Sequence, residues 1–483
     1  MPPEFPLARS AADALRNLGD YAANVVAPTL RIGVTGLARS GKTVFTTALV
    51  HNLLTNAAMP AFRASAEGRI RRARLAPQPD DAVPRFPYEE HLAALVEERR
   101  WPHSTTRINE LRIAIDYERG AGAWLSGPSS LTLDIVDYPG EWLLDLALLD
   151  EDFESWSRAT IAASDSPDKR GLAREWREHL ATLDPASRAD ESVIGRASDL
   201  FKAYLFALRD GPESVATTPP GRFLMPGDLA GSPALTFAPL ALADGARPPS
   251  GSLGALMRRR YDAYLRHVVR PFFRDHFQRI DRQIVLIDVL AAIDSGPLAL
   301  AELERALDRV LMSVRAGRNS VLSSIFAPRA DRVLFAATKA DHLHQVQHRR
   351  LEAILRMLVE RAMRRVQAAG AQVGAVALAS LRATHETTVR DGAHILKAVA
   401  GTPEAGERIG DEVFDGHTEA AVFPGDLPED PTAIFRGAIE PGSLRFPRFR
   451  PASVAPGRPG GDPRLPFIRL DRALEFLIGD RLP

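Results

Sequence analysis

The segment GLARSGKT, from residue 36 to residue 43, constrains the fold of this chain more than any other feature. It matches the pattern G-x-x-x-x-G-K-[ST], in which small residues let successive backbone N–H groups curl around a phosphate. An apolar run, 30–35, precedes it, and a helical pattern, 42–54, follows it. Because the start of a helix favours negative charge, this order predicts a phosphate-binding loop between a strand and a helix.

Individual positions of the loop have distinct expected roles. Gly36, Ser40 and Gly41 are the small residues that let the backbone approach a phosphate. Lys42 would reach the β- and γ-phosphates, and the Thr43 hydroxyl would ligate Mg²⁺. Only five of the 61 basic residues are lysines, so a lysine at this place is informative. Chance would give roughly 0.002 matches to the pattern, so the alternative, a glycine turn before an ordinary helix, is disfavoured.

Arg39 lies inside the same loop and has two interpretations. It could contact phosphate from within the chain, or it could face solvent as most loop arginines do. The second interpretation is favoured, and Arg39 stays among the candidate nucleotide-binding residues.

A second motif, Asp137-Tyr138-Pro139-Gly140, ends the apolar strand pattern 130–136. A carboxylate at a strand end can hold Mg²⁺ through water, and the glycine lets a backbone N–H approach the γ-phosphate. The alternative is an ordinary Asp before a Pro-Gly turn. Its position after a phosphate loop favours the functional interpretation.

Asp288 is a rival for the acidic role, because it also belongs to an apolar strand pattern, 283–289. It lacks the following glycine, and the pattern places it in the middle of the strand. Asp137 is therefore preferred.

Thr338-Lys339-Ala340-Asp341 follows the apolar run 332–337 and matches T-K-x-D, a variant of the guanine motif N-K-x-D. Asp341 can accept two hydrogen bonds, from the guanine N1–H and the exocyclic amine, which adenine does not present. The stem of Lys339 can lie across the base. Such a site rejects adenine because the buried carboxylate would stay unpaired. The alternative is an acidic first turn of a helix.

A loop that begins Ser380-Leu381 follows the last apolar strand pattern, 373–379. By its order in the chain it fits a loop whose backbone N–H contacts the guanine O6. The letters alone carry little information, and the position carries the prediction.

Strand and helix patterns alternate, which predicts an α/β fold with a mostly parallel sheet flanked by helices. A helical pattern at 9–26 precedes the first strand, and a mainly helical stretch with a Pro/Gly-rich part interrupts the alternation. The expected organisation is an N-terminal helix, a nucleotide-binding core in two parts, a helical insertion, and a C-terminal extension that packs on the core. Their boundaries are, in the same order, 1–29, 30–145 with 281–400, 146–280, and 401–483.

Composition excludes several classes of protein. Lys+Arg and Asp+Glu are each 61, so the chain is no polycation and we expect no nucleic-acid partner. The absence of Cys removes disulfides and thiolate sites and fits a reducing compartment, so we expect a cytoplasmic protein. We see no secretory signal and no run of about 18–20 apolar residues, so no transmembrane segment is expected. Five arginines between 63 and 74 predict a solvated, mobile stretch or, alternatively, a peripheral docking surface for acidic lipid or a partner.

The ordered set GLARSGKT, DYPG, TKAD and SLRAT resembles the Ras-like branch of the P-loop GTPases. The strings WPHST, INELRI and VDYPGEWLLDL, with FPYEE near 86–90 and FPGDLP near 423–428, are similar to those of the YcjX family of stress-associated predicted GTPases. The resemblance covers most of the chain. It implies a Ras-like core that binds GTP or GDP with Mg²⁺, an unknown protein effector, and a role linked to stress.

The resemblance also implies roles for single residues. Thr105, in WPHST, aligns with the first-switch threonine that completes Mg²⁺ coordination, and the adjacent Thr106 is the alternative. Mg²⁺ would then be held by Thr43, Thr105 and Asp137. Lys42, Thr105 and Glu141 would be the residues nearest the reaction, and Gly140 would belong to the second switch.

Two positions depart from the pattern of this branch. Thr338 stands where Asn is usual, so a hydrogen bond between the base loop and the phosphate loop would differ. Glu141 stands where many relatives have a water-orienting Gln, and an ionised Glu would repel the γ-phosphate. Glu141 could orient water, act as a base, or only start a helix.

The sequence thus favours a GTP-binding switch with slow intrinsic hydrolysis, whose helical insertion begins directly after the second switch. A P-loop ATPase or chaperone-like enzyme is one alternative. An interaction protein with a purely structural nucleotide site is another.

Overall fold

The computed structural model describes most of the chain, and two sequence predictions fall outside its described part. The helical pattern at 9–26 is one, and the proposed Mg²⁺ ligand Thr105, with its neighbour Thr106, is the other. The described residues are 28–37, 39–103, 107–120, 128–167, 169–210, 218–243, 248–312, 330–437, 439, 443–454 and 464–483.

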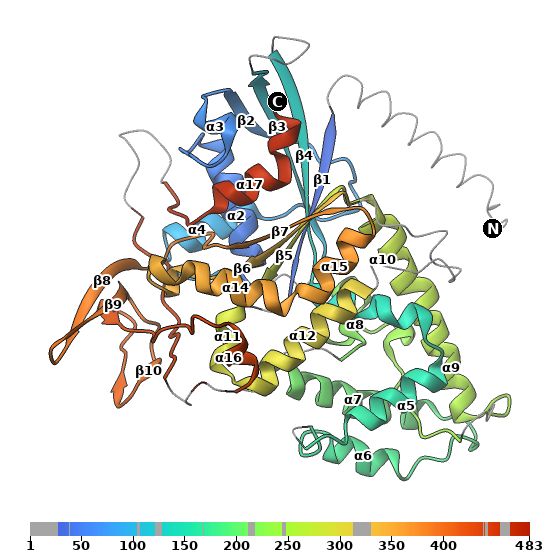
Figure 1. Cartoon of the computed structure of the whole chain (residues 1–483). Helices are drawn as coiled ribbons and strands as arrows, with labels where there is room; N and C mark the ends of the chain where they lie inside the picture. The colour runs from blue at the N-terminus through green and yellow to red at the C-terminus, as the bar shows by residue number, and fades with distance from the viewer. Residues whose placement is uncertain are drawn as a thin grey trace.

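A seven-stranded sheet lies at the centre of the described chain, in the order β2-β3-β4-β1-β5-β6-β7 (Figure 1). Neighbouring strands from β4 to β7 are parallel, whereas β3 is antiparallel to both β2 and β4. The expected α/β fold with a mostly parallel sheet is therefore confirmed. The strands are β1 (Thr29–Gly36), β2 (Ile70–Ala76), β3 (Asn109–Glu118), β4 (Pro128–Asp137), β5 (Arg282–Ile287), β6 (Arg332–Ala337) and β7 (Gln372–Ala377).

Helices cover both faces of this sheet, because β5 and β6 are apolar on both sides. One face carries the helix after the phosphate loop together with the C-terminal helix, and the other carries the helices that connect β5, β6 and β7. The first group is α2 (Lys42–Leu54), α3 (Arg63–Ala66), α4 (Tyr88–Val96) and α17 (Leu470–Ile478), with η8 (Gly479–Arg481) after it. The second is α11 (Val289–Asp294), α12 (Pro297–Met312), η6 (Ala340–His342), η7 (Gln345–Gln347), α14 (His348–Leu358) and α15 (Glu360–Ala368).

The chain between β4 and β5 is helical and forms the lower right part of Figure 1. Its core is aromatic, and Trp156 and Trp176 are both buried against Phe201. The elements are η1 (Gly140–Asp150), α5 (Phe153–Ala163), α6 (Arg174–Leu180), α7 (Glu191–Asp210), α8 (Gly221–Leu224), η2 (Gly227–Leu229), η3 (Pro233–Leu235), α9 (Leu253–Tyr264), η4 (Leu265–Val269), α10 (Arg270–Asp275) and η5 (Phe277–Arg279).

A small antiparallel sheet, which the sequence did not predict, follows β7 and lies at the lower left of Figure 1. It has its own apolar cluster, which includes Val399, Val422 and Phe449. The short strands are β8 (His385–Asp391), β9 (His394–Gly401) and β12 (Ala420–Val422), with the pair β10 (Arg408–Ile409) and β11 (Glu412–Val413) and a later turn of helix, α16 (Thr432–Phe435).

The arginine-rich stretch 63–74 is not the mobile segment expected from its composition. Part of it forms the edge strand β2, which pairs with β3. Arg71 and Arg74 form ion pairs with Glu118 and Asp116 on that neighbouring strand. The arginines therefore stabilise strand pairing across the sheet edge.

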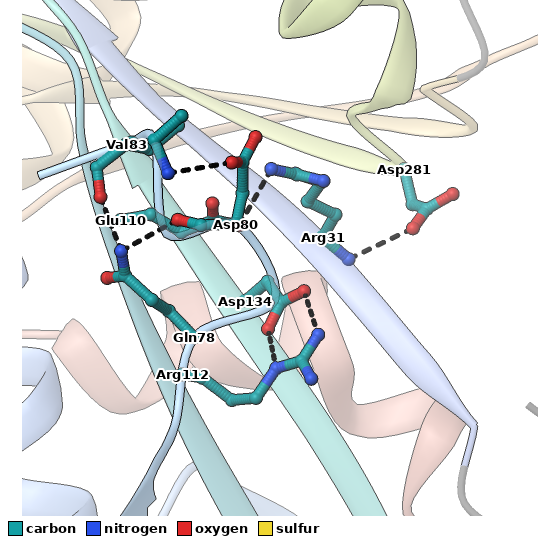
Figure 2. Close-up of polar contacts among 9 residues, drawn as sticks. Arg31, Gln78, Asp80, Val83, Glu110, Arg112, Asp134 and Asp281 are labelled. Carbon is teal, nitrogen blue, oxygen red and sulfur yellow. Dashed lines mark hydrogen bonds and ion pairs between the residues drawn. The ribbon is translucent and has the colours of Figure 1, made fainter. Parts of the chain in front are cut away.

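Charged side chains are also buried inside the sheet (Figure 2). Glu110 of β3 is 0% exposed, and its carboxylate accepts a hydrogen bond from Arg31 of β1 at 2.7 Å. Beside it, Arg112 and Asp134 form an ion pair with two bonds of 2.6 and 2.8 Å. Burial raises the pKa of Glu110 to about 7, although the Arg31 cation acts in the opposite direction. Folding therefore favours the protonated form of this carboxyl.

None of the helices in the described chain combines the length and the apolar character that a membrane span requires.

Candidate functional site

One cleft of about 280 Å³ lies at the carboxyl ends of the parallel strands, where α/β sheets bind their ligands. Lys42 of the phosphate loop and Asp341 of the T-K-x-D motif both line it. The structure thus brings together two segments that lie about 300 residues apart in the chain. The predicted site residues that line the cleft are Arg39, Ser40, Gly41, Lys42, Thr43, Thr338, Lys339, Asp341, Ser380 and Leu381.

The phosphate loop holds its lysine against its own backbone. Lys42 Nζ donates to the carbonyl of Gly36 at 2.6 Å and to that of Leu37 at 3.2 Å. Gly41 precedes α2 with φ 87°, a left-handed conformation that suits glycine, and no side chain caps the helix. The first N–H groups of α2 therefore have no side-chain acceptor and can bind an anion.

Gly140 of the DYPG motif packs directly on the phosphate loop. A Cβ atom at this position would lie 2.1 Å from the carbonyl oxygen of Gly36 and 3.1 Å from the nitrogen of Leu37. Only glycine fits this contact. The backbone of the second motif is therefore in direct contact with the loop that would hold the phosphates.

Four predicted site residues do not line the cleft itself: Gly36, Asp137, Gly140 and Glu141. Asp137 is buried at the end of β4, opposite Val34 of β1. Glu141 is buried at the start of η1, and its Oε1 accepts no hydrogen bond. This position agrees with a role in starting the helix, and the other two roles considered for Glu141 stay predictions.

Asp288 was expected in the middle of a strand, but β5 ends at Ile287 and Asp288 caps the next helix. Its Oδ1 accepts from the Ala291 N–H at 3.1 Å, and its Oδ2 forms an ion pair with Lys339. Asp288 thus belongs to the base end of the cleft, where it fixes the lysine of the T-K-x-D motif. It does not take the place of Asp137.

The T-K-x-D motif is held rigidly by its neighbours. Lys339 has φ 60°, a left-handed conformation that is uncommon for a residue with a side chain. Asp341 is buried, and its Oδ2 accepts from the Ala383 N–H at 2.8 Å. Thr338 Oγ1 donates to the carbonyl of Ile287 at 3.3 Å, so this hydrogen bond goes to β5 and not to the phosphate loop. Asp341 thus keeps carboxylate lone pairs that can accept from a base.

Eight residues that line the cleft lie outside the predicted site. Val44, Pro102, His342 and Ala379 lie within or next to the motifs, and the other four are Trp101, Glu404, Arg448 and Phe449. Trp101 begins the string WPHST, which is one of the strings similar to those of the YcjX family, so the sequence contained a signal for this residue. The other three come from the C-terminal part of the chain and belong to no motif.

The residues present fit a nucleoside triphosphate with Mg²⁺. Ser40 Oγ is buried beside Gly36 and has no hydrogen-bond partner in the described structure, as expected of a hydroxyl that a phosphate would engage. The described residues contain no group of three or more metal-ligating His, Asp or Glu. Mg²⁺ needs none, because it binds through one or two protein oxygens, phosphates and water. Thr43 and Asp137 are the described oxygen donors at the predicted positions.

Three further predicted residues, Arg39, Ser380 and Leu381, also line the cleft. Arg39 is exposed, as expected of a solvent-facing loop arginine, and its contact with phosphate stays a prediction. Ser380 and Leu381 are buried and lie beside Asp341 in the cleft lining.

Comparison with known proteins agrees with this architecture. The model of the YcjX-like family, DUF463, matches residues 30–482. A protein of Escherichia coli (strain K12) named Ras-like GTPase YcjX is 36% identical over 467 residues, which are 94% of this chain and 96% of that protein. A protein of the same name from Shewanella oneidensis is 33% identical over 482 residues, 94% of each chain. The sheet and the phosphate loop form the Ras-like P-loop core expected from the sequence, and this chain belongs to the YcjX-like family.

Proposed function

We propose that this protein binds GTP and GDP with Mg²⁺ and acts as a nucleotide-dependent switch with slow intrinsic hydrolysis. The observation that carries the proposal is that Lys42 and Asp341 line the same cleft. The names of the two relatives agree with it. A role in a stress response and a cytoplasmic location belong to the same proposal.

The cleft would bind the phosphates at one end, near Lys42, and the base at the other end, near Asp341. We call these the phosphate end and the base end. At the phosphate end, the ammonium of Lys42 would exchange its bonds to the loop carbonyls for bonds to the β- and γ-phosphates. At the base end, Asp341 would accept from the guanine N1–H and exocyclic amine, while Lys339 lies over the base. Mg²⁺, held by Thr43, Asp137 and Thr105, would neutralise charge on the phosphates.

The segment after Gly140 is the part of the chain that would respond to the γ-phosphate. Its side chains reach into the helices between β4 and β5. Asp145 is buried and accepts hydrogen bonds from Gly221 N at 2.6 Å and Tyr264 OH at 2.6 Å. The guanidinium carbon of Arg222 lies 3.1 Å from the centre of the Trp142 ring. A movement of Gly140 would therefore be transmitted to these helices.

Slow hydrolysis is proposed because Glu141 is buried away from the cleft lining. Because Glu141 is not among the residues that line the described cleft, we infer that it orients no attacking water in this arrangement. An effector or a rearrangement of η1 would be needed to bring it into the cleft.

Titration with fluorescent mant-GTP and mant-ATP tests the choice of base. We expect guanine to bind at least about a hundredfold more tightly, since adenine leaves the buried Asp341 carboxylate unpaired. Equal affinities, or a preference for ATP, would remove the guanine assignment in favour of a P-loop ATPase.

Limited proteolysis with GDP and with a non-hydrolysable GTP analogue tests the switch. We expect the cleavage pattern of residues 140–280 to depend on the nucleotide. Indistinguishable digests would instead favour a purely structural nucleotide site.

A further inference from the structure

A segment near the C-terminus, residues 444–451, forms one wall of the cleft. Arg448 and Phe449 line the cleft together with Trp101. Trp101 Nε1 donates to the carbonyl of Phe449 at 2.7 Å. Two residues earlier, Arg99 Nε donates to the carbonyl of Pro451 at 3.1 Å. The chain that leads into the predicted first switch is thus tied to this segment, which we call the C-terminal wall.

Backbone hydrogen bonds fix the C-terminal wall to the end of the small sheet. Glu404 N donates to the carbonyl of Arg448, and Arg450 N donates to that of Thr402, both at 2.8 Å. Arg448 also forms an ion pair with Glu407 at 2.7 Å. These contacts hold the wall in one register relative to the cleft.

The same wall contacts the loop that carries Asp341. The ring of Phe449 lies edge-on against His342, with 5.4 Å between ring centres. Phe449 is 1% exposed and shares an apolar cluster with Ala383, whose N–H holds the Asp341 carboxylate. The wall is therefore adjacent to the loop that would read the base.

Charge at the wall agrees with this position. Arg448 lies between two carboxylates, Glu404 at 3.5 Å and Glu407 at 2.7 Å. Of these three groups, Glu404 and Arg448 line the cleft and their opposite charges cancel, while the Glu404 carboxylate can accept hydrogen bonds from hydroxyl groups. An uncharged nucleoside is the ligand portion that fits here.

We propose that the C-terminal wall, residues 444–451, is part of the nucleotide site and, with Trp101, closes it over the nucleoside. This proposal rests on the proposed function. Docking of the wall and binding of nucleotide then stabilise each other, because each completes a surface that the other contacts. The wall would slow the release of GDP. Because it is bonded to the small sheet, nucleotide binding would also affect the small sheet.

Dissociation rates of mant-GDP from the full-length protein test the proposal. Phe449→Ala removes the ring that packs on His342 and should speed release by roughly tenfold. Trp101→Phe keeps an aromatic ring but removes the bond to the wall, and should speed release by roughly threefold. Phe435→Ala is the control, since Phe435 lies in α16, outside the wall, packs on another core and does not line the cleft. Its release rate should equal that of the wild type.

Hydrogen–deuterium exchange of the peptide that covers 444–451 provides a second readout on the wild type. GDP should slow exchange in this peptide, and Trp101→Phe should reduce the protection.

Equal release rates in the wild type, Trp101→Phe and Phe435→Ala would overturn the proposal, whether or not Phe449→Ala folds. A wild type that binds mant-GDP but shows no protection of 444–451 would also overturn it and leave the proposed function intact. A wild type that binds no guanine nucleotide would overturn both.

Discussion

At the phosphate end of the cleft, the segment after Gly140 is held by side chains. One buried carboxylate, that of Asp145, accepts from Gly221 N, Arg222 N and Tyr264 OH. Burial raises the pKa of Asp145 to about 6, against the effect of these hydrogen bonds. At the base end, by contrast, the loop at 379–384 is held mainly by backbone hydrogen bonds, in addition to the one that the Asp341 carboxylate accepts from Ala383 N.

Ala379 and Ile468 exchange two backbone hydrogen bonds of 3.0 and 2.8 Å, and Arg382 N donates to the carbonyl of Pro466 at 2.8 Å. Backbone hydrogen bonds persist after most side-chain substitutions. The three hydrogen bonds at the phosphate end, in contrast, all depend on the single carboxylate of Asp145. The comparison suggests a fixed base end and a phosphate end whose contacts can rearrange with the nucleotide.

The largest effect should come from Lys42→Ala. This change removes the ammonium that would face the β- and γ-phosphates, so we expect nucleotide affinity to fall by at least about a hundredfold. Isothermal titration with GDP measures it. The fold should persist, because α2 keeps its other contacts, and an unchanged circular dichroism spectrum is the control. Retained affinity would contradict the assignment of the phosphate end.

Asp145→Ala should be the most destabilising change at the second switch segment. It leaves two buried N–H groups and one hydroxyl without their acceptor, which should cost about 3 kcal/mol of unfolding free energy. Urea unfolding measures the loss. Asp152→Ala is the control, since this exposed helix cap should cost only about 1 kcal/mol. Similar losses in both variants would mean that Asp145 does not secure this end.

Substitutions at Ile468 test whether backbone holds the base end. Ile468→Pro removes the N–H that donates to Ala379, and we expect GDP affinity to fall by roughly tenfold. Ile468→Ala keeps that bond and should change affinity by less than about twofold. Fluorescence titration compares them. Equal effects of the two changes would show that the side chain, and not the backbone, positions the loop.

Glu110 should give the smallest effect, one visible only in its pH dependence. Its folded pKa of about 7 lies above the ordinary glutamate pKa of 4.5, so the folded state binds more protons than the unfolded state between these values. Its contribution to stability is therefore lost as pH rises through this window. Glu110→Gln should remove that part of the slope, which the difference between the two unfolding curves from pH 5 to pH 8 isolates. A pH-independent difference would contradict the raised pKa.

Much of the fold was accessible from the sequence because buried parallel strands are continuous apolar runs. Five strands of the central sheet and the helix Lys42–Leu54 were predicted from such patterns. The strand Ile70–Ala76 was missed, because its arginines are paired with acids on a neighbouring strand that composition does not reveal.

The motif part of the site was also predictable, since each motif has fixed spacing. The C-terminal wall was not, because Arg448 and Phe449 reach the cleft only through long-range contacts with Trp101 and Thr402. Short strands such as Arg408–Ile409 carry too few residues to show a period.

The central claim is that one cleft binds both the phosphates and the base of a guanine nucleotide. The base preference of Asp341→Asn tests this claim most directly. Xanthine carries a carbonyl where guanine has its exocyclic amine, so an amide donor should bind what the carboxylate would repel. Competition titrations against mant-GDP or mant-XDP would give the affinities of GDP and XDP for the wild type and for the variant. We expect the wild type to prefer GDP and Asp341→Asn to prefer XDP. The same GDP-to-XDP ratio in both proteins would contradict the account.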